Sequence, residues 1–302
     1  LSRIGAKKNK KWLLENTKNI SIFKIDISNN NQINKIIKKI KPDSIIHLAG
    51  QTAVTTSIKN PILDFKSNII GTFNLLESIR IYSPKTTFIN ASTNKVYGDL
   101  SDISFQENKV RYYSKKIKGI NEQKNLSFST PYGCSKGAAD QYTIDYAKVF
   151  GLKTITLRQS CIYGNLQNGN EDQGWVSWFV KLAMNKKKIN IFGNGKQVRD
   201  LLHINDLVNL YYLILLNKKI MDGTAYNVGG GFNNAISLLE LINYLEKILK
   251  FKIKKRHLLP RQADQMLYIS DNNKIYERLK WKPLTNFKNG ILNMIEFNYL
   301  KN

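Results

Sequence analysis

Cysteine is scarce in this sequence of 302 residues, which contains only Cys134 and Cys161. Two cysteines this far apart fit neither a disulfide framework nor the spacing of a metal site, so we predict no metal and a reducing, cytoplasmic location. Long apolar runs are missing as well. The longest candidate, 207–216, is shorter than the roughly 18 residues of a membrane span and is typical of a buried helix. No secretory leader pattern opens the sequence.

Acidic residues are few: 22 Asp and Glu stand against 47 Lys and Arg, which gives a net charge of +25. Such an excess can indicate a protein that binds nucleic acid or an anionic surface. The lysines are scattered and form no stripe interleaved with aromatic side chains. We therefore attribute the charge to an overall amino-acid composition shifted toward Lys, Asn and Ile. We predict no nucleic-acid partner and no membrane partner. The charge still attracts a small anionic substrate.

A glycine-rich phosphate loop between a strand and a helix is also missing, although the sequence has 18 glycines. The densest run, 229–231, follows a short apolar segment and is not followed at once by a helix, so we interpret it as a turn. The sequence therefore lacks the usual site for a dinucleotide pyrophosphate, at a glycine-rich helix N-terminus.

Strand-like and helix-like segments alternate along the chain. Apolar patterns predict strands at 21–25, 44–49, 87–92, 154–158 and 225–228. They predict helices at 30–39, 64–81, 205–216 and from 131 and 237 onward. This alternation favours an α/β fold whose parallel sheet has helices on both faces. In such sheets ligands bind beyond the carboxyl ends of the strands, where Asp26, 49–51 and 92–93 fall.

The remaining segments are less regular. Residues 100–128 are polar and basic and are predicted to form a surface loop. The alternation weakens between 159 and 200, where 193–200 is predicted to form a hairpin or turn carrying two cations. Ser237 followed by Glu240 predicts a capping box at the start of a helix.

Tyr132 and Lys136 are four residues apart, so a helix that begins near Pro131 would place both side chains on one face. Tyrosine is a poor acid or base at neutral pH because its reference pKa is about 10. A lysine ammonium one turn away favours the phenolate and lowers that pKa. Such a pair can exchange a proton with a sugar hydroxyl while a nicotinamide carries the hydride. The pair alone is common by chance, but the upstream strand end at 91–93 favours the functional interpretation.

Short motifs follow one another in a fixed order along nearly the whole chain. They are Asp26-Ile27, 47–51, 68–72, 92–98, Tyr132 with Lys136, Arg158 with 163–164, 199–206 and 226–229. Together they resemble the extended short-chain dehydrogenase/reductase family, the sugar-nucleotide epimerases and dehydratases. The resemblance implies NAD as cofactor, a nucleotide sugar as substrate, a homo-oligomer, and a place in the synthesis of surface polysaccharide such as O-antigen.

The resemblance also implies a fold and its division into domains. It implies a Rossmann-like, doubly wound parallel sheet that is truncated at its N-terminus, with a smaller C-terminal α/β domain for the sugar nucleotide. The predicted NAD-binding domain covers 1–158, with 201–228 returning to it. The predicted substrate domain covers 159–200 and 229–302.

The resemblance assigns roles to single residues. Thr93 takes the place of the active-site Ser or Thr, whose hydroxyl bonds the reacting sugar oxygen beside the Tyr132 oxygen, and Lys136 also bonds the nicotinamide ribose. The implied catalytic residues are Thr93, Tyr132 and Lys136. The implied cofactor-binding residues are Asp26, Ile27, Ala49, Gly50, Gln51, Asn68, Ser92, Tyr132 and Lys136. The implied substrate-binding residues are Thr93, Asn94, Gln197, Arg199, Arg261 and Asp264.

Ordinary structural roles remain open for several of these residues. Asn68 could cap a turn, and Asp26 could simply end a strand. Arg199 and Arg261 could be surface cations, although a guanidinium fork suits the oxygens of a diphosphate.

Two features narrow the activity within the family. Dehydratases place an Asp-Glu pair after the active-site Thr, whereas Thr93 is followed by Asn and Lys, which argues against a 4,6-dehydratase. Cys161 stands where the family usually has Asn, which suggests a grip on the substrate different from that of a 4-epimerase. The segments that resemble 2-epimerases of CDP-hexoses are 92–99, 131–142 and 172–176.

We therefore predict an NAD-dependent sugar-nucleotide 2-epimerase that oxidises C2 transiently and returns the hydride to the opposite face. One alternative is a 4-epimerase of UDP-sugars. Another is a truncated, non-catalytic remnant that binds a dinucleotide or nucleic acid. The intact set of Thr93, Tyr132 and Lys136 argues against the remnant, because a binding protein does not need all three.

The beginning of the chain departs from the family pattern. The family opens with a strand, a Gly-x-x-Gly-x-x-Gly turn, a helix and a second strand that ends in an acid. The residues 1–3 resemble the segment just after that acid. We therefore expect that roughly thirty residues of the pattern, including two parallel strands, are missing from a fragment, a split gene or a misassigned start.

Overall fold

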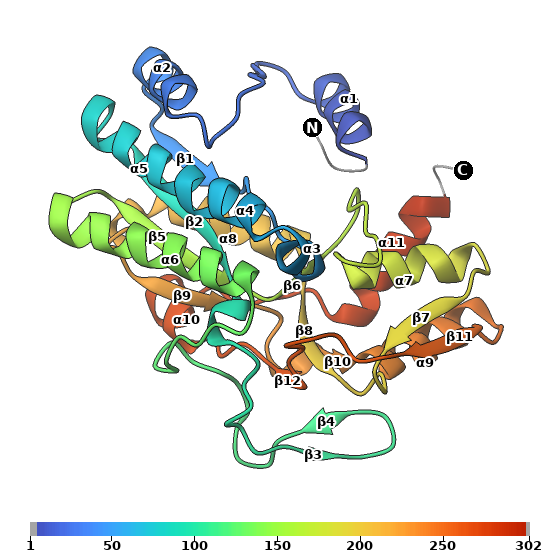
Figure 1. Cartoon of the computed structure of the whole chain (residues 1–302). Coiled ribbons are helices and arrows are strands. Elements are labelled where there is room, and N and C mark those ends of the chain that lie inside the picture. Colours follow the sequence, from blue (N-terminus) through green and yellow to red (C-terminus); the bar gives the residue numbers. More distant parts are fainter. Residues whose placement is uncertain (1–4, 300–302) are drawn as a thin grey trace.

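A four-stranded parallel sheet lies at the centre of the chain, with strand order β1-β2-β5-β9 (Figure 1). This is a computed structural model, and it describes residues 5–299. The segment 1–3, which resembles the region after the family's acid, lies outside the described residues. The strands are β1 (Ser44–His47), β2 (Thr87–Thr93), β5 (Thr154–Gln159) and β9 (Ala225–Val228). The prediction of an α/β fold with a parallel sheet is confirmed.

Helices cover both faces of this sheet, as predicted (Figure 1). Side chains of a strand alternate between its two faces, and two neighbours in β2 show the result. Phe88 packs with residues of α2, α5 and α6, whereas Ile89 packs with residues of α8 and α10 on the other side, and both are fully buried. These helices are α2 (Asn30–Ile40), α5 (Gly71–Tyr82), α6 (Pro131–Phe150), α8 (Ile204–Leu216) and α10 (Asn273–Leu279).

A smaller α/β unit follows the end of β5. Its strands are β6 (Cys161–Tyr163), β7 (Ile189–Phe192), β8 (Val198–His203), β10 (Ala235–Ser237), β11 (Lys255–Leu258) and β12 (Leu267–Tyr268). Its helices are α7 (Trp175–Met184), α9 (Leu238–Leu249) and α11 (Phe287–Tyr299). Val180, Leu241 and Ile291 bring these three helices into one apolar core. Trp281 packs instead against the central sheet, and the exact division into two domains stays a prediction.

The other elements, apart from α1, have at most six residues each. They are α1 (Ala6–Asn16), α3 (Val54–Lys59), α4 (Pro61–Asp64), the π-helical η1 (Phe65–Ile70), η2 (Asn94–Tyr97), β3 (Gln106–Glu107), β4 (Tyr112–Tyr113), η3 (Lys218–Ile220) and η4 (Phe232–Asn234). The helix predicted at 64–81 is thus three joined segments that begin at Pro61. The surface loop at 100–128 is confirmed apart from the small hairpin of β3 and β4. The capping box of Ser237 and Glu240 is confirmed at the start of α9.

The strand predicted at 21–25 is wrong. These residues have no regular structure, and Ile22, Phe23 and Ile25 are exposed. A strand needs a neighbouring ladder for its backbone hydrogen bonds, and in the described part of the chain β1 pairs with β2 alone. The segment 21–25 does not pair with the outer edge of β1, so its apolar pattern lacks the ladder that a strand needs.

Residues 5–299 contain neither a membrane-spanning helix nor a cluster of metal ligands. No helix there combines the length and apolarity needed to cross a membrane. No group of three or more His, Cys, Asp or Glu side chains gathers there in a way that could hold a metal ion.

His47 provides a pH-dependent contribution to stability. Its ring is buried at the end of β1, and Nε2 lies 3.0 Å from Thr72 Oγ1. Burial, helped by repulsion from Lys136, lowers the pKa of His47 to about 3. The unfolded chain binds a proton near the ordinary pKa of 6.5 and the folded chain does not, so stability falls as the pH drops below 6.5.

We expect this residue to remove about 2 kcal/mol of unfolding free energy between pH 7.5 and pH 5. Urea unfolding at both pH values measures the loss. In His47→Gln the loss between the two pH values should be smaller by about that amount. An unchanged pH dependence in this variant would show that His47 is not buried in its neutral form.

Candidate active site

Helix α6 places the predicted Tyr-Lys pair at its beginning. The Thr130 side chain caps the helix by accepting a hydrogen bond from the backbone N–H of Gly133 at 3.1 Å, and Pro131 occupies the first turn. Tyr132 and Lys136 follow on successive turns, are both buried, and line the same cavity. The prediction that the two side chains share one helix face is thus confirmed.

Lys136 reaches from α6 to the end of β2. Its Nζ donates a hydrogen bond to the backbone oxygen of Ala91 at 2.5 Å. Burial lowers the pKa of Lys136 to about 8, although attraction to Asp140 opposes that effect. The ammonium is therefore still the main form at neutral pH, where it can stabilise a neighbouring phenolate.

A network of buried charges fixes α6 against the sheet. Asp140 on α6 accepts two hydrogen bonds from the Arg158 guanidinium of β5, at 2.9 and 3.0 Å, and a third from Ser92 Oγ at 2.9 Å. Arg158 also donates to the Tyr97 hydroxyl at 3.0 Å. Arg158 and Asp140 are almost entirely buried. The network sets the position of the helix that carries Tyr132, about two turns before Asp140.

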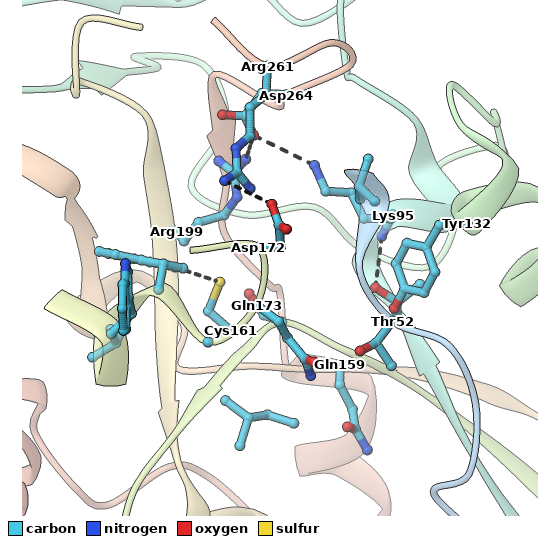
Figure 2. Close-up of a pocket in the computed structure, with 18 of the residues that line it drawn as sticks. Thr52, Lys95, Tyr132, Gln159, Cys161, Asp172, Gln173, Arg199, Arg261 and Asp264 are labelled. Carbon is cyan, nitrogen blue, oxygen red and sulfur yellow. Dashed lines mark hydrogen bonds and ion pairs between the residues drawn. The ribbon is translucent and has the colours of Figure 1, made fainter. Parts of the chain in front are cut away.

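A cavity of about 500 Å³ lies beyond the carboxyl ends of the central strands. The residues that line it near α6 include Ala49, Gly50, Ser92, Thr93, Tyr132 and Lys136. Figure 2 shows Tyr132 and Thr52 on one side of this cavity and Arg199, Arg261, Asp172 and Asp264 toward the other, with Lys95 between them and joined to Asp264. The position agrees with the general rule that parallel sheets bind ligands at this edge.

Two predicted cofactor residues lie behind the cavity wall. The backbone N–H of Gln51 donates to Asn68 Oδ1 at 2.9 Å, and Asn68 Nδ2 donates to the Gln51 oxygen at 3.0 Å and to Ser135 Oγ at 2.9 Å. A methyl group on Gly50 would come within 2.6 Å of Asn68 Oδ1. Glycine therefore allows the loop at 49–51 to lie directly on the Asn68 side chain. Asn68 holds this loop against α6.

The other two predicted cofactor residues are away from the cavity lining. Asp26 accepts hydrogen bonds from the backbone N–H and the hydroxyl of Ser28, which together lower its pKa. The Ile27 side chain packs on Gly71, and its backbone oxygen accepts from Asn74 Nδ2 at 3.0 Å. Their contact with an adenine stays a prediction.

Cations gather at the part of the cavity formed by the smaller α/β unit. Arg199 on β8 is buried, and its Nη2 donates to Asp264 Oδ1 at 2.6 Å. Lys95 Nζ lies 3.7 Å from the same oxygen, and Gln197 Nε2 donates to Asp264 Oδ2 at 3.3 Å. Burial alone would raise the pKa of Asp264, but Arg199 and Lys95 lower it below its ordinary value. The acid is therefore ionised and holds the cations in place.

Arg261 reaches the cavity from the segment after β11. Its Nη2 donates to the Glu171 backbone oxygen at 2.7 Å and lies 3.3 Å from Asp172 Oδ1 (Figure 2). Its guanidinium also covers the Phe192 ring, with 4.1 Å to the ring centroid. Arg261 is thus held by a backbone oxygen, a carboxylate and an aromatic ring, and is not a free surface cation.

The predicted substrate residues are brought together with one difference. Thr93, Gln197, Arg199, Arg261 and Asp264 all line the cavity. Asn94 does not: its Nδ2 donates to Gln265 Oε1 at 3.2 Å, inside the protein.

Several lining residues were not predicted as site residues. They are Thr52, Lys95, Gln159, Cys161, Glu171, Asp172, Gln173 and Trp175, among others. Lys95 is the most informative, because burial and the nearby Arg199 lower its pKa to about 8 while Asp264 opposes the shift. Its position two residues after Thr93 is the sequence feature that could have indicated a place in the active site.

The residues around Tyr132 fit the nicotinamide ribose of NAD. The Lys136 ammonium has three protons and uses one on the Ala91 oxygen, so it can also donate to a ribose hydroxyl. Ala49 has only a methyl group and Gly50 no side chain, so both leave room in the same space.

Comparisons with known proteins agree with this geometry. The sequence model of the GDP-mannose 4,6 dehydratase family matches residues 3–294. The CDP-paratose 2-epimerase of Salmonella typhi is 44% identical, over 98% of this chain and 89% of its own length. A solved structure of the UDP-glucose 4-epimerase of Thermotoga maritima with UDP-glucose has a TM-score of 0.81 at 25% identity and covers 99% of this chain and 96% of that chain.

A further solved structure contains the cofactor. The UDP-glucuronic acid 4-epimerase of Bacillus cereus, in complex with UDP-glucuronic acid and NAD, has a TM-score of 0.82 at 25% identity and covers 98% of this chain and 87% of that chain. The match of motif, fold and sequence over nearly the whole chain confirms the predicted family. The chain belongs to the extended short-chain dehydrogenase/reductase family and is an NAD-dependent sugar-nucleotide epimerase of that family.

Proposed function

We propose that this epimerase converts CDP-paratose to CDP-tyvelose by inverting C2 of the hexose. The observation that carries the proposal is one cavity with Thr93, Tyr132 and Lys136 on one side and Arg199 and Arg261 toward the other. The 44% identity to the CDP-paratose 2-epimerase of Salmonella typhi supports the choice of substrate.

Tyr132 is the proposed acid and base. Its phenolate takes the proton of the C2 hydroxyl as C2 is oxidised, and returns it when C2 is reduced. The Lys136 ammonium stabilises that phenolate from one turn further along α6. The Thr93 hydroxyl donates a hydrogen bond to the reacting oxygen and fixes its position. NAD would be held beside Tyr132 and Lys136 and would supply the acceptor, and then the donor, of the C2 hydride.

Inversion requires the keto sugar to present its second face while the rest of the substrate stays bound. Arg199 and Arg261 are suited to hold the diphosphate, because guanidinium groups bind phosphate oxygens in pairs. The hexose can then turn about its bonds to the anchored diphosphate. Arg199 is buried, and both arginines are already held by carboxylates, so little of their mobility is lost when substrate binds.

Lys95 is consistent with an epimerase and not with a dehydratase. It lines the cavity two residues after Thr93, where the dehydratase pattern has an acid. A lysine that is ionised and paired with Asp264 cannot act as the carboxylate of an elimination. We propose that it donates a hydrogen bond to the substrate between the hexose and the diphosphate.

The test is conversion of CDP-paratose, followed by NMR through the coupling of the C2 proton. We expect a mixture of CDP-paratose and CDP-tyvelose with NAD supplied. The same assay is run with UDP-glucose and UDP-glucuronic acid. Turnover of a UDP-sugar without turnover of CDP-paratose would contradict the proposal and identify a 4-epimerase.

The remaining proposals follow from the same assignment. We propose that Asp26 and Ile27 lie at the adenine of NAD and that Asn68 and Gln51 support the cofactor through the loop that contains Gly50. We also propose a cytoplasmic homo-oligomer that acts in surface-polysaccharide synthesis. Size measurement by light scattering tests the oligomer.

A further inference from the structure

Glu171 and Asn190 form a polar pair in the part of the cavity away from Tyr132. Asn190 Nδ2 donates a hydrogen bond to Glu171 Oε1 at 2.8 Å, and both residues line the cavity. Asn190 belongs to β7, and Glu171 precedes α7 on the segment held by Arg261. Figure 2 shows Arg261 and Asp172, the neighbour of Glu171, on the side of the cavity away from Tyr132.

The order of groups along the cavity determines what this pair can meet. A nucleotide sugar has its hexose at one end, its diphosphate in the middle and its base at the other end. With the hexose at Tyr132 and the diphosphate at Arg199 and Arg261, the base lies beyond the arginines. Glu171 and Asn190 line the cavity beside Arg261, which bonds the Glu171 backbone oxygen and covers the Phe192 ring of β7, so we place the pair at that end.

The chemistry of the pair matches one base better than another. Cytosine has an amino group at position 4 and acceptors at N3 and O2, whereas uracil has an oxygen at position 4 and a donor at N3. A Glu carboxylate is a natural acceptor for the cytosine amino group. The second N–H of the Asn190 amide can donate to a cytosine acceptor. Against uracil, the carboxylate would face an oxygen without a proton between them.

The positions of both side chains are set before a ligand binds. Arg261 holds the Glu171 backbone oxygen at 2.7 Å, and the Asn190 amide holds the Glu171 carboxylate. A carboxylate can accept several hydrogen bonds, so its bond from Asn190 leaves capacity for the amino group.

We infer that Glu171, positioned by Asn190, reads the 4-amino group of a cytosine base and makes this enzyme selective for cytidine nucleotides over uridine nucleotides. The inference rests on the proposed function, because that function sets the direction in which the substrate lies. Beyond that function, Glu171 and Asn190 are the residues that select cytosine over uracil.

Calorimetric titration of the whole chain with CDP and with UDP tests this inference without turnover. We expect CDP to bind more tightly by about 10- to 100-fold, the size of one specific base contact. In Glu171→Gln the amide can donate to the uracil oxygen as well as accept, so the ratio of affinities should fall at least about fivefold, chiefly through weaker binding of CDP.

Asp172→Asn is the matched control. It removes a negative charge from the same segment, next to Arg261, and it should shift the affinities for CDP and UDP together and leave their ratio unchanged. Equal binding of CDP and UDP by the unaltered chain, no measurable binding of either, or the same ratio in Glu171→Gln would each overturn the inference.

The binding test of this inference and the conversion test of the proposed function can give different results. A CDP preference that depends on Glu171, together with no conversion of CDP-paratose, would keep the base assignment and reject the C2 reaction. Conversion of CDP-paratose with no preference for CDP over UDP would support the C2 reaction and reject the base assignment.

Discussion

Replacing Tyr132 by Phe is expected to lower the turnover of CDP-paratose by about 10³-fold, because it removes the only group proposed to exchange the substrate proton. The ring remains, so its packing at the start of α6 should be kept. Affinity for CDP should change by less than about twofold, since the diphosphate and base bind elsewhere in the cavity. Steady-state kinetics measure turnover, and calorimetry measures the binding of CDP.

Tyr142→Phe is the control for this prediction. Tyr142 lies on the same helix but is 41% exposed and does not line the cavity, so its hydroxyl should be dispensable for turnover. Loss of activity in both variants would point to damage of α6. Full activity in Tyr132→Phe would reject the proposed proton transfer.

Replacing Arg158 by Met is expected to lower the unfolding free energy by about 3–5 kcal/mol, because the Asp140 carboxylate would stay buried without its guanidinium partner. Side chains of the ion pair are only 6% and 0% exposed. The bond from Ser92 compensates only in part, since a hydroxyl does not neutralise the charge. Urea unfolding, followed by circular dichroism, measures the difference.

Arg278→Met is the matched control, because Arg278 and Asp222 form an ion pair of 2.9 Å whose side chains are 47% and 39% exposed. Water screens such a pair, and its loss should cost less than about 1 kcal/mol. The double variant Arg158→Met with Asp140→Leu should recover part of the loss, because no buried charge remains. Equal effects of the two single variants would contradict the central role given to the Arg158–Asp140 pair.

The central sheet and its helices could be predicted because their signals are local. The apolar segment at 87–92 and the Ser237 capping box depend on residues close in sequence, and both appear at the predicted places. Whether residues 21–25 form a strand could not be predicted from local residues. Their pattern is suitable, but whether the strand forms depends on a distant partner strand, which local spacing does not report.

Some residues of the active site could also be placed from local spacing, whereas others depend on long-range packing. Tyr132 and Lys136 could be placed together because a helix fixes the distance between positions i and i+4. Lys95, Asp264 and Arg199 come from three separate elements or loops, and their contact depends on how the smaller α/β unit meets the central sheet. Sequence spacing likewise could not show that Asn94 bonds Gln265, because the two residues are 171 positions apart.

Glu171 and Asn190 show what long-range packing adds. They are 19 positions apart, on a loop and on an edge strand, and neither has a distinctive sequence context. Only the folded chain shows that their side chains meet inside the cavity of Tyr132 and Arg199.

The most direct test of the central claim uses CDP-paratose that carries deuterium at C2, incubated in ordinary water with NAD. Mass spectrometry and NMR follow the label in the epimerised product. Transient oxidation predicts CDP-tyvelose that retains the deuterium at C2, because the hydride that leaves this carbon returns to it. Product with hydrogen from water at C2 would contradict this account and would indicate inversion by removal and return of a proton.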